Sequence, residues 1–297
     1  MRNVWIGLAI VLLTTVVGGG TFVYRQITKL TWEQVQGDVY VIKGLGGNVG
    51  VLKTREGAVV VDTMTFPIQG ERIRALAEEL AGGPVHTVIN THYHRDHTHG
   101  NPAFGSASQI IATERTREHL LARDADSWED EAAATLPNKL VNDSLEIEIG
   151  GKTLRLLHPG RGHTDGDLVV LFVEDRVVHL GDLFFNRRYP RIDRPGGGSA
   201  REWTSTLDHA LALDFDRVIP GHGAITDAAG LRAFQSFLSE AVREVEAAVS
   251  AGRSRAQAQA EVELESDAGY GPGGLPPIVV LDLPAMVGEI WDEVTAR

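Results

Sequence analysis

The side chains best suited to chemistry lie in residues 91–100, whose sequence is THYHRDHTHG. Between His92 and His97, this stretch places three imidazoles and one carboxylate within six residues. Neutral imidazole nitrogens and a carboxylate oxygen suit zinc, and also iron or manganese, far better than they suit calcium. His92 and His94 lie two apart on an extended segment, so their side chains point to the same side and can bind one ion together. Asp96 and His97, on the turn that follows, can reach a second ion nearby.

A histidine-rich surface loop without a metal is the alternative interpretation of this stretch. It is disfavoured because the closely packed order HxHxDH directly follows residues 85–90, an apolar run that predicts a buried strand. A short segment cannot complete a metal site by itself, since the ion needs further ligands. The rest of the chain must therefore supply them.

Three later motifs carry further candidate ligands. The segment GHTDGD carries His163, the dipeptide GD carries Asp182, and the segment PGHG carries His222. Each lies where an apolar strand gives way to a glycine turn, and in layered α/β domains binding residues collect on such loops. On its own, His163 would be interpreted as a capping or core histidine; its place after the first motif favours a ligand.

Taken together, the order HxHxDH, GHT, GD and PGHG over about residues 35–225 resembles the metallo-β-lactamase superfamily of metallohydrolases. The resemblance implies an α/β fold of two packed β-sheets with helices on both outer faces, a four-layer αββα sandwich. It also implies two Zn²⁺ ions per chain, although iron and manganese are compatible with the same residue types. The ligands implied are His92, His94 and His163 for one ion, Asp96, His97 and His222 for the other, and Asp182 as a bridge between them.

The resemblance also implies a mechanism. A bridging carboxylate and a bridging hydroxide relieve the repulsion between two neighbouring dications. The ions lower the pKa of water towards neutrality, which supplies hydroxide as the nucleophile, and one ion polarises the substrate oxygen. Asp96 is the residue that the family uses to handle the proton passing to the leaving group, which makes it the candidate catalytic residue.

The residue at position 182 helps to choose among branches of the superfamily. The antibiotic-cleaving branches carry cysteine or serine there, whereas thioesterase, lactonase and phosphodiesterase branches carry aspartate, as this chain does. We therefore predict a binuclear zinc hydrolase that uses a metal-bridging hydroxide to cleave an ester, thioester, lactone or amide bond of a small molecule.

Three alternatives to this function stay open. The first is β-lactam hydrolysis, as a true or a promiscuous activity. The second is a non-heme iron redox protein on the same fold, which is disfavoured because His94 stands where that branch has glutamate and no flavin module follows. The third is a non-catalytic binding protein, which is disfavoured because all seven expected ligands are present.

Composition excludes several other classes. The chain has 297 residues with 43% hydrophobic and 23% charged content, which is typical of folded globular proteins. A formal charge of −12 disfavours a nucleic-acid partner, which needs a basic face. The absence of cysteine excludes disulfides and thiolate ligands. A small-molecule substrate is the expected partner.

The first part of the chain predicts contact with a membrane. Asn3–Tyr24 carries no formal charge, and as a helix its 22 residues would span about 33 Å, enough for a bilayer core. It could be an uncleaved anchor or a secretory signal peptide, and the basic residues on both sides do not decide the orientation. We predict a targeting segment with linker over residues 1–29, and a hydrolase domain over residues 30–297 on the extracytoplasmic side.

Periodicity predicts the remaining elements. Apolar and alternating runs predict an antiparallel meander of strands at 35–42, 49–54 and 58–62, a strand at 108–112, and hairpins over 145–157 and 168–180. Helices are predicted from Pro67 to the Gly82-Gly83 pair, at 114–123, and near 200–213, 228–250 and 284–295. The Gly/Pro-rich residues 271–277 are interpreted as a link.

Some polar residues keep two interpretations. Asp62, at the end of an early strand, either supports the metal loop by accepting a hydrogen bond or caps a turn. Residues 184–189, FFNRRY, form either a substrate-binding rim whose arginines meet an anionic group or a solvated basic loop with two core aromatics. Six histidines match no ligand position and are expected to be structural or exposed: His86, His99, His119, His158, His179 and His209.

Overall fold

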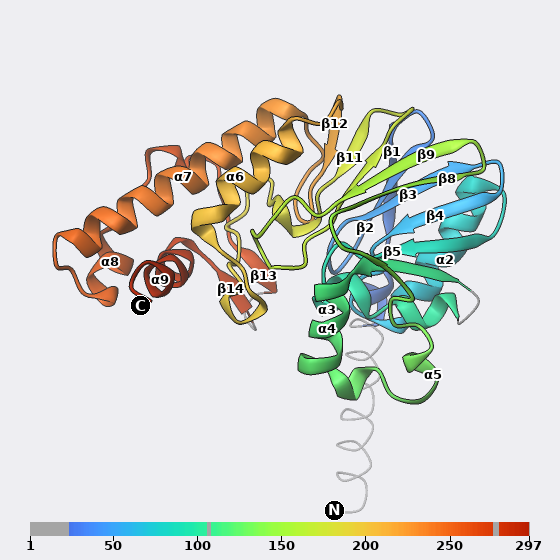
Figure 1. The fold of residues 1–297 in the computed structure, drawn as a ribbon, viewed down its shortest axis with the longest axis horizontal. Helices are drawn as coiled ribbons and strands as arrows, with labels where there is room; N and C mark the ends of the chain where they lie inside the picture. The colour runs from blue at the N-terminus through green and yellow to red at the C-terminus, as the bar shows by residue number, and fades with distance from the viewer. Residues whose placement is uncertain (1–23, 106–107, 276–278, 297) are drawn as a thin grey trace, which may run out of the picture.

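Two β-sheets pack face to face in the computed structural model, which describes residues 24–105, 108–275 and 279–296 (Figure 1). The larger sheet has seven strands in sequence order, antiparallel from β1 to β4 and parallel from β4 to β7. Its strands are β1 (Thr31–Gln36), β2 (Val39–Lys43), β3 (Val49–Thr54), β4 (Gly57–Val61), β5 (Val85–Ile89), β6 (Gln109–Thr113) and β7 (Lys139–Val141).

The smaller sheet has five strands in the order β12-β11-β10-β9-β8, of which only the β11–β12 pair is parallel. These strands are β8 (Ser144–Ile149), β9 (Lys152–Leu157), β10 (Val169–Phe172), β11 (Val177–His179) and β12 (Arg217–Ile219). A core of buried side chains joins the inner faces of the two sheets, with Val41 and Leu52 from one and Leu156 and Phe172 from the other.

Helices cover the outer faces of both sheets. α2 (Pro67–Ala81) packs Ile73 and Ala77 on the larger sheet, whereas α6 (Ala200–Leu211) and α7 (Ala228–Ser250) pack on the smaller one. The other helices are α3 (Arg95–Thr98), α4 (Glu114–Arg123), α5 (Asp130–Ala133), α8 (Arg255–Glu261) and α9 (Leu283–Val294). The predicted α/β architecture of two sheets between helical layers is therefore confirmed.

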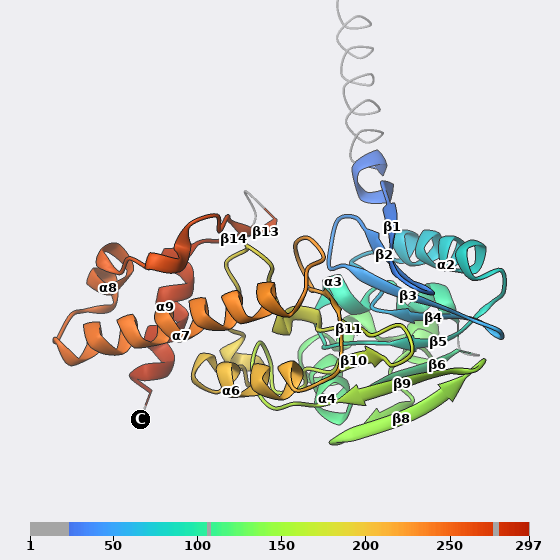
Figure 2. The same ribbon diagram turned by 90° about the horizontal axis from the view of Figure 1, so that it is seen from above.

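The C-terminal elements form a lobe beside the smaller sheet, at the left of Figure 1. There α7 packs against α6 and α9, α8 packs against α9, and a short strand pair, β13 (Gly273–Leu275) and β14 (Val279–Leu281), precedes α9. The strand pair lies on the same side of the molecule as α2 and the start of β1, at the top of Figure 2. The residues predicted to be a simple link, 271–277, thus contribute one strand of this pair, β13.

The N-terminal targeting segment predicted over Asn3–Tyr24 lies, except for Tyr24, outside the described residues. Within the described part of the chain, no helix combines the length and the apolar character needed to cross a bilayer. Residues 24–28 are helical and lead directly into β1.

The structure differs from the predicted elements at its short strands. The alternating run 35–42 is divided between β1 and β2, because Gly37 has a φ of +55° and reverses the chain between them. A side chain at Gly37 would also collide with Asp175, since its Cβ would lie 2.0 Å from Oδ1. The three-residue strands β7, β13 and β14 were not predicted, because so few residues show no periodicity.

Candidate metal centre

The seven side chains that the sequence selects as ligands lie together at one edge of the sandwich. His92 and His94 follow β5, Asp96 and His97 lie on α3, and the other three follow strands of the smaller sheet. Potential ligand atoms converge in two groups, each within 4.8 Å: His92, His94, His163 and Asp182 in one, and Asp96, His97 and His222 in the other. The division is the one that the sequence predicts, whereas the binding of ions by these residues stays a prediction.

Asp182 lies between the two groups. Its Oδ2 is 3.5 Å from Nε2 of His163 and 3.8 Å from Nε2 of His92. Its Oδ1 is 3.2 Å from Nε2 of His97 and 3.4 Å from Nε2 of His222. One carboxylate oxygen therefore faces each group.

The structure itself tests whether metal ions fit these residues. Nε2 of His92, Nε2 of His97 and Oδ1 of Asp182 are buried and have no hydrogen-bond partner of acceptable geometry. Buried polar atoms are rarely left unpaired, because each costs free energy comparable to a lost hydrogen bond. A cation would satisfy all three atoms, so the residues fit metal binding.

Two glycines make room for the cluster. A Cβ on Gly47 would lie 2.3 Å from the ring of His97, and a Cβ on Gly221 would lie 2.0 Å from Oδ1 of Asp182. Contacts this short do not occur between real atoms, so any larger residue would displace the candidate ligands.

Each of four histidines is oriented by a contact at its second ring nitrogen. Such contacts fix the tautomer and direct the other nitrogen to the ion. The pairs are Nδ1 of His97 with Oδ2 of Asp62 at 2.7 Å, Nε2 of His94 with Oδ2 of Asp193 at 2.9 Å, Nδ1 of His163 with the carbonyl oxygen of Arg191 at 2.7 Å, and Nδ1 of His92 with Oγ1 of Thr91 at 3.1 Å.

A family model described as the metallo-beta-lactamase superfamily matches residues 42–222, which include all seven candidate ligands. The chain belongs to the metallo-β-lactamase superfamily. Members of this superfamily are metal-dependent hydrolases, and many bind zinc.

Relatives within the superfamily have different names. The chain is 30% identical over 201 residues to the 2,4-dinitroanisole O-demethylase subunit alpha of a Nocardioides strain, which covers 67% of this chain and 59% of that relative. It is 21% identical over 210 residues to the type 2 metallo-beta-lactamase of Bacillus cereus, covering 70% and 79% of the two chains. It is 24% identical over 215 residues to a linear primary-alkylsulfatase of a Pseudomonas strain, covering 58% and 40%.

Solved structures show the same fold. A metallo-beta-lactamase from Pontibacter korlensis superposes with a TM-score of 0.60 at 20% identity, covering 71% of this chain and 99% of that one. A double mutant of a sec-alkyl sulfatase superposes with a TM-score of 0.70 at 15% identity, covering 90% and 50%. Coverage of 90% must include part of the C-terminal helices, so the likeness of fold extends beyond the two sheets.

Burial and neighbouring charges shift the pKa values of two candidate ligands, His163 and His222, in opposite directions. Burial lowers the pKa of His163 to about 4, which keeps this imidazole neutral. Burial acts in the same direction on His222, but the carboxylates of Asp182 and Asp96 outweigh it and raise its pKa to about 10. A cation must therefore displace the proton of His222 to bind at this group, and metal binding there should weaken in acid.

A pocket of about 930 Å³ opens over the two groups. Its lining combines apolar side chains such as Leu45, Phe185 and Leu281 with charged ones. Phe185 also stacks on the ring of His222, with the centroids 5.3 Å apart and the planes 16° from parallel. The charged lining residues are Arg95, Arg123, Arg188, Arg191, Asp96, Asp124, Asp182 and Asp193.

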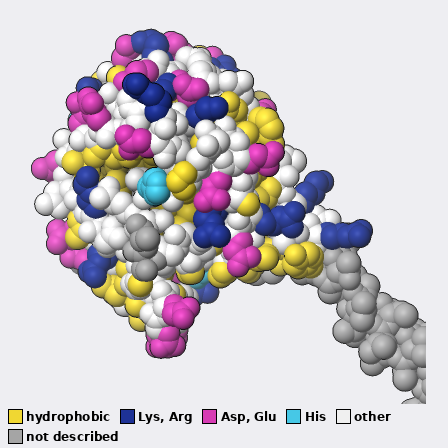
Figure 3. Space-filling view, turned by 90° about the vertical axis from the view of Figure 1, so that its right-hand side faces the viewer, with side chains coloured by type: hydrophobic (Ala, Val, Ile, Leu, Met, Phe, Trp, Pro, Cys, Tyr) yellow, Lys and Arg dark blue, Asp and Glu magenta, His cyan; other side chains and the backbone are white. Residues whose placement is uncertain are grey.

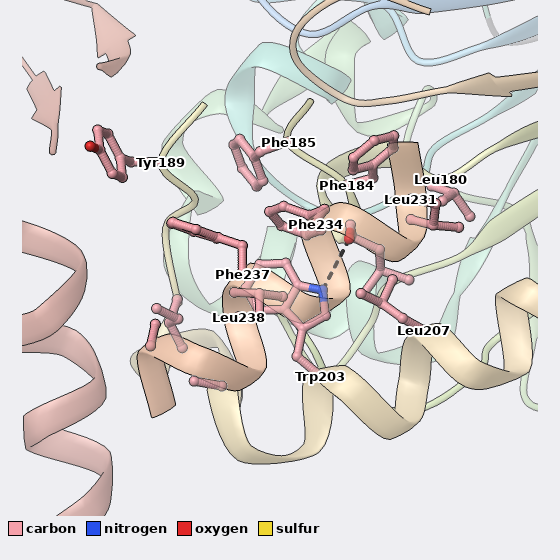
Figure 4. Close-up of a cluster of buried hydrophobic side chains, with 14 of the residues drawn as sticks. Leu180, Phe184, Phe185, Tyr189, Trp203, Leu207, Leu231, Phe234, Phe237 and Leu238 are labelled. Carbon is pink, nitrogen blue, oxygen red and sulfur yellow. Dashed lines mark hydrogen bonds between the residues drawn. The ribbon is translucent and has the colours of Figure 1, made fainter. Parts of the chain in front are cut away.

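The loop after Asp182 has the core aromatics of one interpretation, whereas the substrate-binding rim of the other stays a prediction. Trp203 donates from Nε1 to the carbonyl oxygen of Leu183 at 3.0 Å, and Phe184 packs against Phe234 in the core, which fixes the loop on α6 and α7 (Figure 4). Farther along, the exposed Arg188 lines the pocket. The aromatic start of the loop therefore positions Asp182, and one of its two arginines, Arg188, lies at the pocket.

Asp62 has the supporting position that one of its two interpretations gave it. It is completely buried, and besides His97 it accepts hydrogen bonds from the backbone nitrogen and from Oγ1 of Thr91, both at 2.8 Å. Asp193 contacts Nε2 of His94 as Asp62 contacts Nδ1 of His97, and it also accepts a hydrogen bond from the hydroxyl of Tyr93. Sequence reasoning missed Asp193, because an isolated aspartate in an irregular segment carries no local signal.

The six histidines without a predicted ligand role lie outside both groups. His86 is exposed. The others make different contacts: His99 with Asp124, His119 with Asp165, His158 with the carbonyl of Asp167, His179 with the carbonyl of Asn48, and His209 with the carbonyl of Pro159.

Proposed function

We propose that this chain is a binuclear zinc hydrolase that cleaves an ester, thioester, lactone or amide bond of a small molecule. The observation that carries the proposal is the position of Asp182, whose two oxygens each face a separate group of histidines. His92, His94 and His163 would hold one ion, Asp96, His97 and His222 the other, and Asp182 both. When bound, zinc ions acidify water and polarise the oxygen of the bond to be cleaved.

Asp96 is the residue placed to move a proton. Its side chain is 34% exposed, lines the pocket, and has Oδ2 3.2 Å from Nε2 of His222. Burial acts to raise its pKa, but the imidazoles of His97 and His222 outweigh burial and lower the pKa of Asp96 well below its usual range. An ionised carboxylate at the mouth of the site can accept a proton and return it to a leaving group.

The pocket supports a substrate that combines an apolar part with an anionic group. Its lining carries four arginines and four aspartates, so two dications would give it a net charge of +4 within a chain of net charge −12. Such a local field attracts anions. The named relatives include an O-demethylase of 2,4-dinitroanisole and an alkylsulfatase, both of which concern small molecules. The chain spans 59% of the length of the O-demethylase subunit. We therefore infer its activity from the residues of the site and not from the name of that relative.

β-Lactam hydrolysis is a second candidate, supported by the identity of 21–25% to type 2 metallo-beta-lactamases. Asp182 counts against this second candidate, because the antibiotic-cleaving branches carry cysteine or serine at that position. A substrate panel separates them.

We also propose that residues 3–24, which carry no formal charge, attach the chain to a membrane, with the hydrolase domain on the extracytoplasmic side. The length and apolar character of this stretch support the proposal. Flotation of the full chain with lipid vesicles tests the attachment.

The test of the hydrolase uses the full chain purified in mild detergent. We expect two zinc ions per chain by elemental analysis, and metal-dependent turnover of one class in a panel of small esters, thioesters, lactones, amides and β-lactams. Asp182→Ala should reduce the occupancy of both ions and abolish turnover. Full activity of this variant, bound iron in place of zinc, or turnover without metal would contradict the proposal.

A further inference from the structure

Exposed aromatic side chains lie at the start of the described chain and at the start of α2. Tyr24 is 53% exposed, Trp32 is 50% exposed and Phe66, at the start of α2, is 36% exposed. Trp32 packs edge-on against Tyr40, with the ring centroids 5.9 Å apart, so part of this aromatic surface is held in a fixed orientation. Exposed tryptophan and tyrosine are typical of surfaces that lie at the boundary between a membrane and water.

This aromatic surface adjoins the rim of the pocket above the metal centre. Leu30 packs on Gly44, where an added Cβ would lie 2.7 Å from Cδ2 of the leucine. Gly44 and Leu45 line the pocket, and so does Thr65, the neighbour of Phe66. The stretch that joins the apolar N-terminal residues to the sandwich therefore meets it at the pocket rim.

The other side of the rim has a similar character. Pro272, just before β13, and Leu281 of β14 line the pocket, and Val280, next to Leu281 on β14, is 45% exposed. Arg188 donates from Nη1 to the carbonyl oxygen of Pro272 at 3.0 Å, which joins this strand pair to the loop after Asp182. The strand pair, α2 and the helical residues 24–28 all lie towards the same side of the molecule, the upper side of Figure 2.

Positive charge accompanies the aromatic side chains. Arg25 and Lys29 are exposed on either side of the buried Thr28, and Figure 3 shows basic and hydrophobic side chains together next to the point where the described chain begins. Residues 24–33 carry Arg25, Lys29 and Glu33, a net charge of +1, in a chain whose formal charge is −12. Lysine and arginine near an anionic lipid surface are attracted to it.

We propose that the surface formed by Tyr24, Arg25, Lys29, Trp32 and Phe66 docks on an anionic lipid bilayer, with the pocket mouth beside the lipid surface. The inference rests on the proposed membrane attachment, because residues 3–24 are the uncharged stretch that ends at Tyr24. The docking proposal goes beyond membrane attachment, since an anchor alone would leave the hydrolase domain free to rotate relative to the bilayer. Docking fixes which face meets the lipid and lets an amphiphilic substrate enter the pocket from the bilayer.

The absence of cysteine makes the test simple, because one introduced cysteine carries a label alone. Phe66→Cys places a fluorophore on the proposed surface. Leu140→Cys on β7 is the matched control, since Leu140 is 42% exposed and Phe66 is 36% exposed. The labelled full chains are reconstituted in vesicles of phosphatidylcholine with phosphatidylglycerol, and a nitroxide carried on the lipid serves as quencher. We expect a blue shift and quenching at position 66, and neither at position 140.

The charge-reversed variant Arg25→Glu/Lys29→Glu should lose quenching at position 66 while the chain still floats with the vesicles. Equal exposure of positions 66 and 140 to water in floating vesicles would overturn the docking surface. A spectral change at position 66 in detergent that rises with protein concentration would also overturn it, because a second copy would then cover the face. If the chain fails to float, attachment and docking both fall, while zinc content and turnover in detergent still test the hydrolase.

Discussion

The carboxylate of Asp62 lies 2.7 Å from Nδ1 of His97, and both side chains are completely buried. Asp62 has a φ of +68°, a conformation that few residues other than glycine adopt, and this backbone geometry directs its carboxylate towards the metal loop. The same carboxylate binds the backbone and hydroxyl of Thr91. One side chain at the end of β4 therefore fixes both the start of the loop and the ring of a candidate ligand.

Asp62→Asn should weaken zinc binding by about 10–100-fold, because the amide keeps the shape of the carboxylate but removes the charge that orients His97. Competition with a chromogenic chelator measures the affinity. Asp175→Asn is the control, since Asp175 is also buried but pairs with Lys152. Unchanged affinity in Asp62→Asn would show that the contact with His97 is not needed for the ion.

Gly221→Ala should remove metal and also lower the stability of the chain. The new methyl group would lie 2.0 Å from Oδ1 of Asp182 and 2.6 Å from the backbone carbonyl carbon of Gly181, so both the carboxylate and the turn that carries it must move. We expect loss of most zinc by elemental analysis and a lower free energy of unfolding in urea. Gly82→Ala has open space around its Cβ and should keep its zinc, although its φ of +73° makes alanine less stable there.

Trp203→Phe should destabilise the protein by about 1–3 kcal/mol, because the carbonyl oxygen of Leu183 loses a buried hydrogen-bond donor. Urea unfolding measures the change in the free energy of unfolding. Trp128→Phe is a matched control, since Trp128 is equally a buried indole but its Nε1 has no hydrogen-bond partner. Equal effects of the two substitutions would mean that only the loss of ring volume matters.

Glu289 should make stability depend on pH. Burial raises its pKa to about 7 in the folded chain, above the ordinary value of 4.5. The folded state therefore holds this proton more tightly, and the free energy of unfolding should fall as the pH rises between these two values, by at most about 1.4 kcal/mol per pH unit. Glu289→Gln stays neutral and can still accept from the backbone nitrogen of Ile192. Between pH 5 and pH 8, the free energy of unfolding in urea should fall less in this variant than in the wild type.

The longer elements of the fold follow from the sequence because their signals are local. The structure confirms the helix predicted over 114–123 as α4 and the one predicted near 228–250 as α7, which Asp227 begins by accepting from two backbone nitrogens. The predicted meander and hairpins are confirmed as β2-β3-β4, β8-β9 and β10-β11, whereas the pairing of strands far apart in the chain was not predictable in this way. Parallel pairing of β4 with β5, and the buried cluster that contains residues of both β4 and β10, join residues far apart in the chain, and no short window contains that information.

The candidate ligands were predictable because metal sites restrict residue types as well as spacing. His163 or Asp182 alone has many possible roles, and only the four motifs in order select the seven residues that the structure brings together. Asp193 and the rim at Gly44 and Pro272 were not predictable. Their importance arises from the packing of distant loops, to which the local sequence gives no clue.

The two groups of candidate ligands share one further property, since each takes residues from both sheets. Asp96 and His97 come from the loop after β5, whereas His222 follows β12, and the other group is divided in the same way. Neither half of the chain therefore contains a complete ligand set. Ions that bind only when the two sheets are packed together stabilise the folded chain by mass action. Resistance of the newly made chain to proteolysis should consequently follow the zinc supply of its compartment, and two co-expressed halves should reassemble only where the metal is abundant.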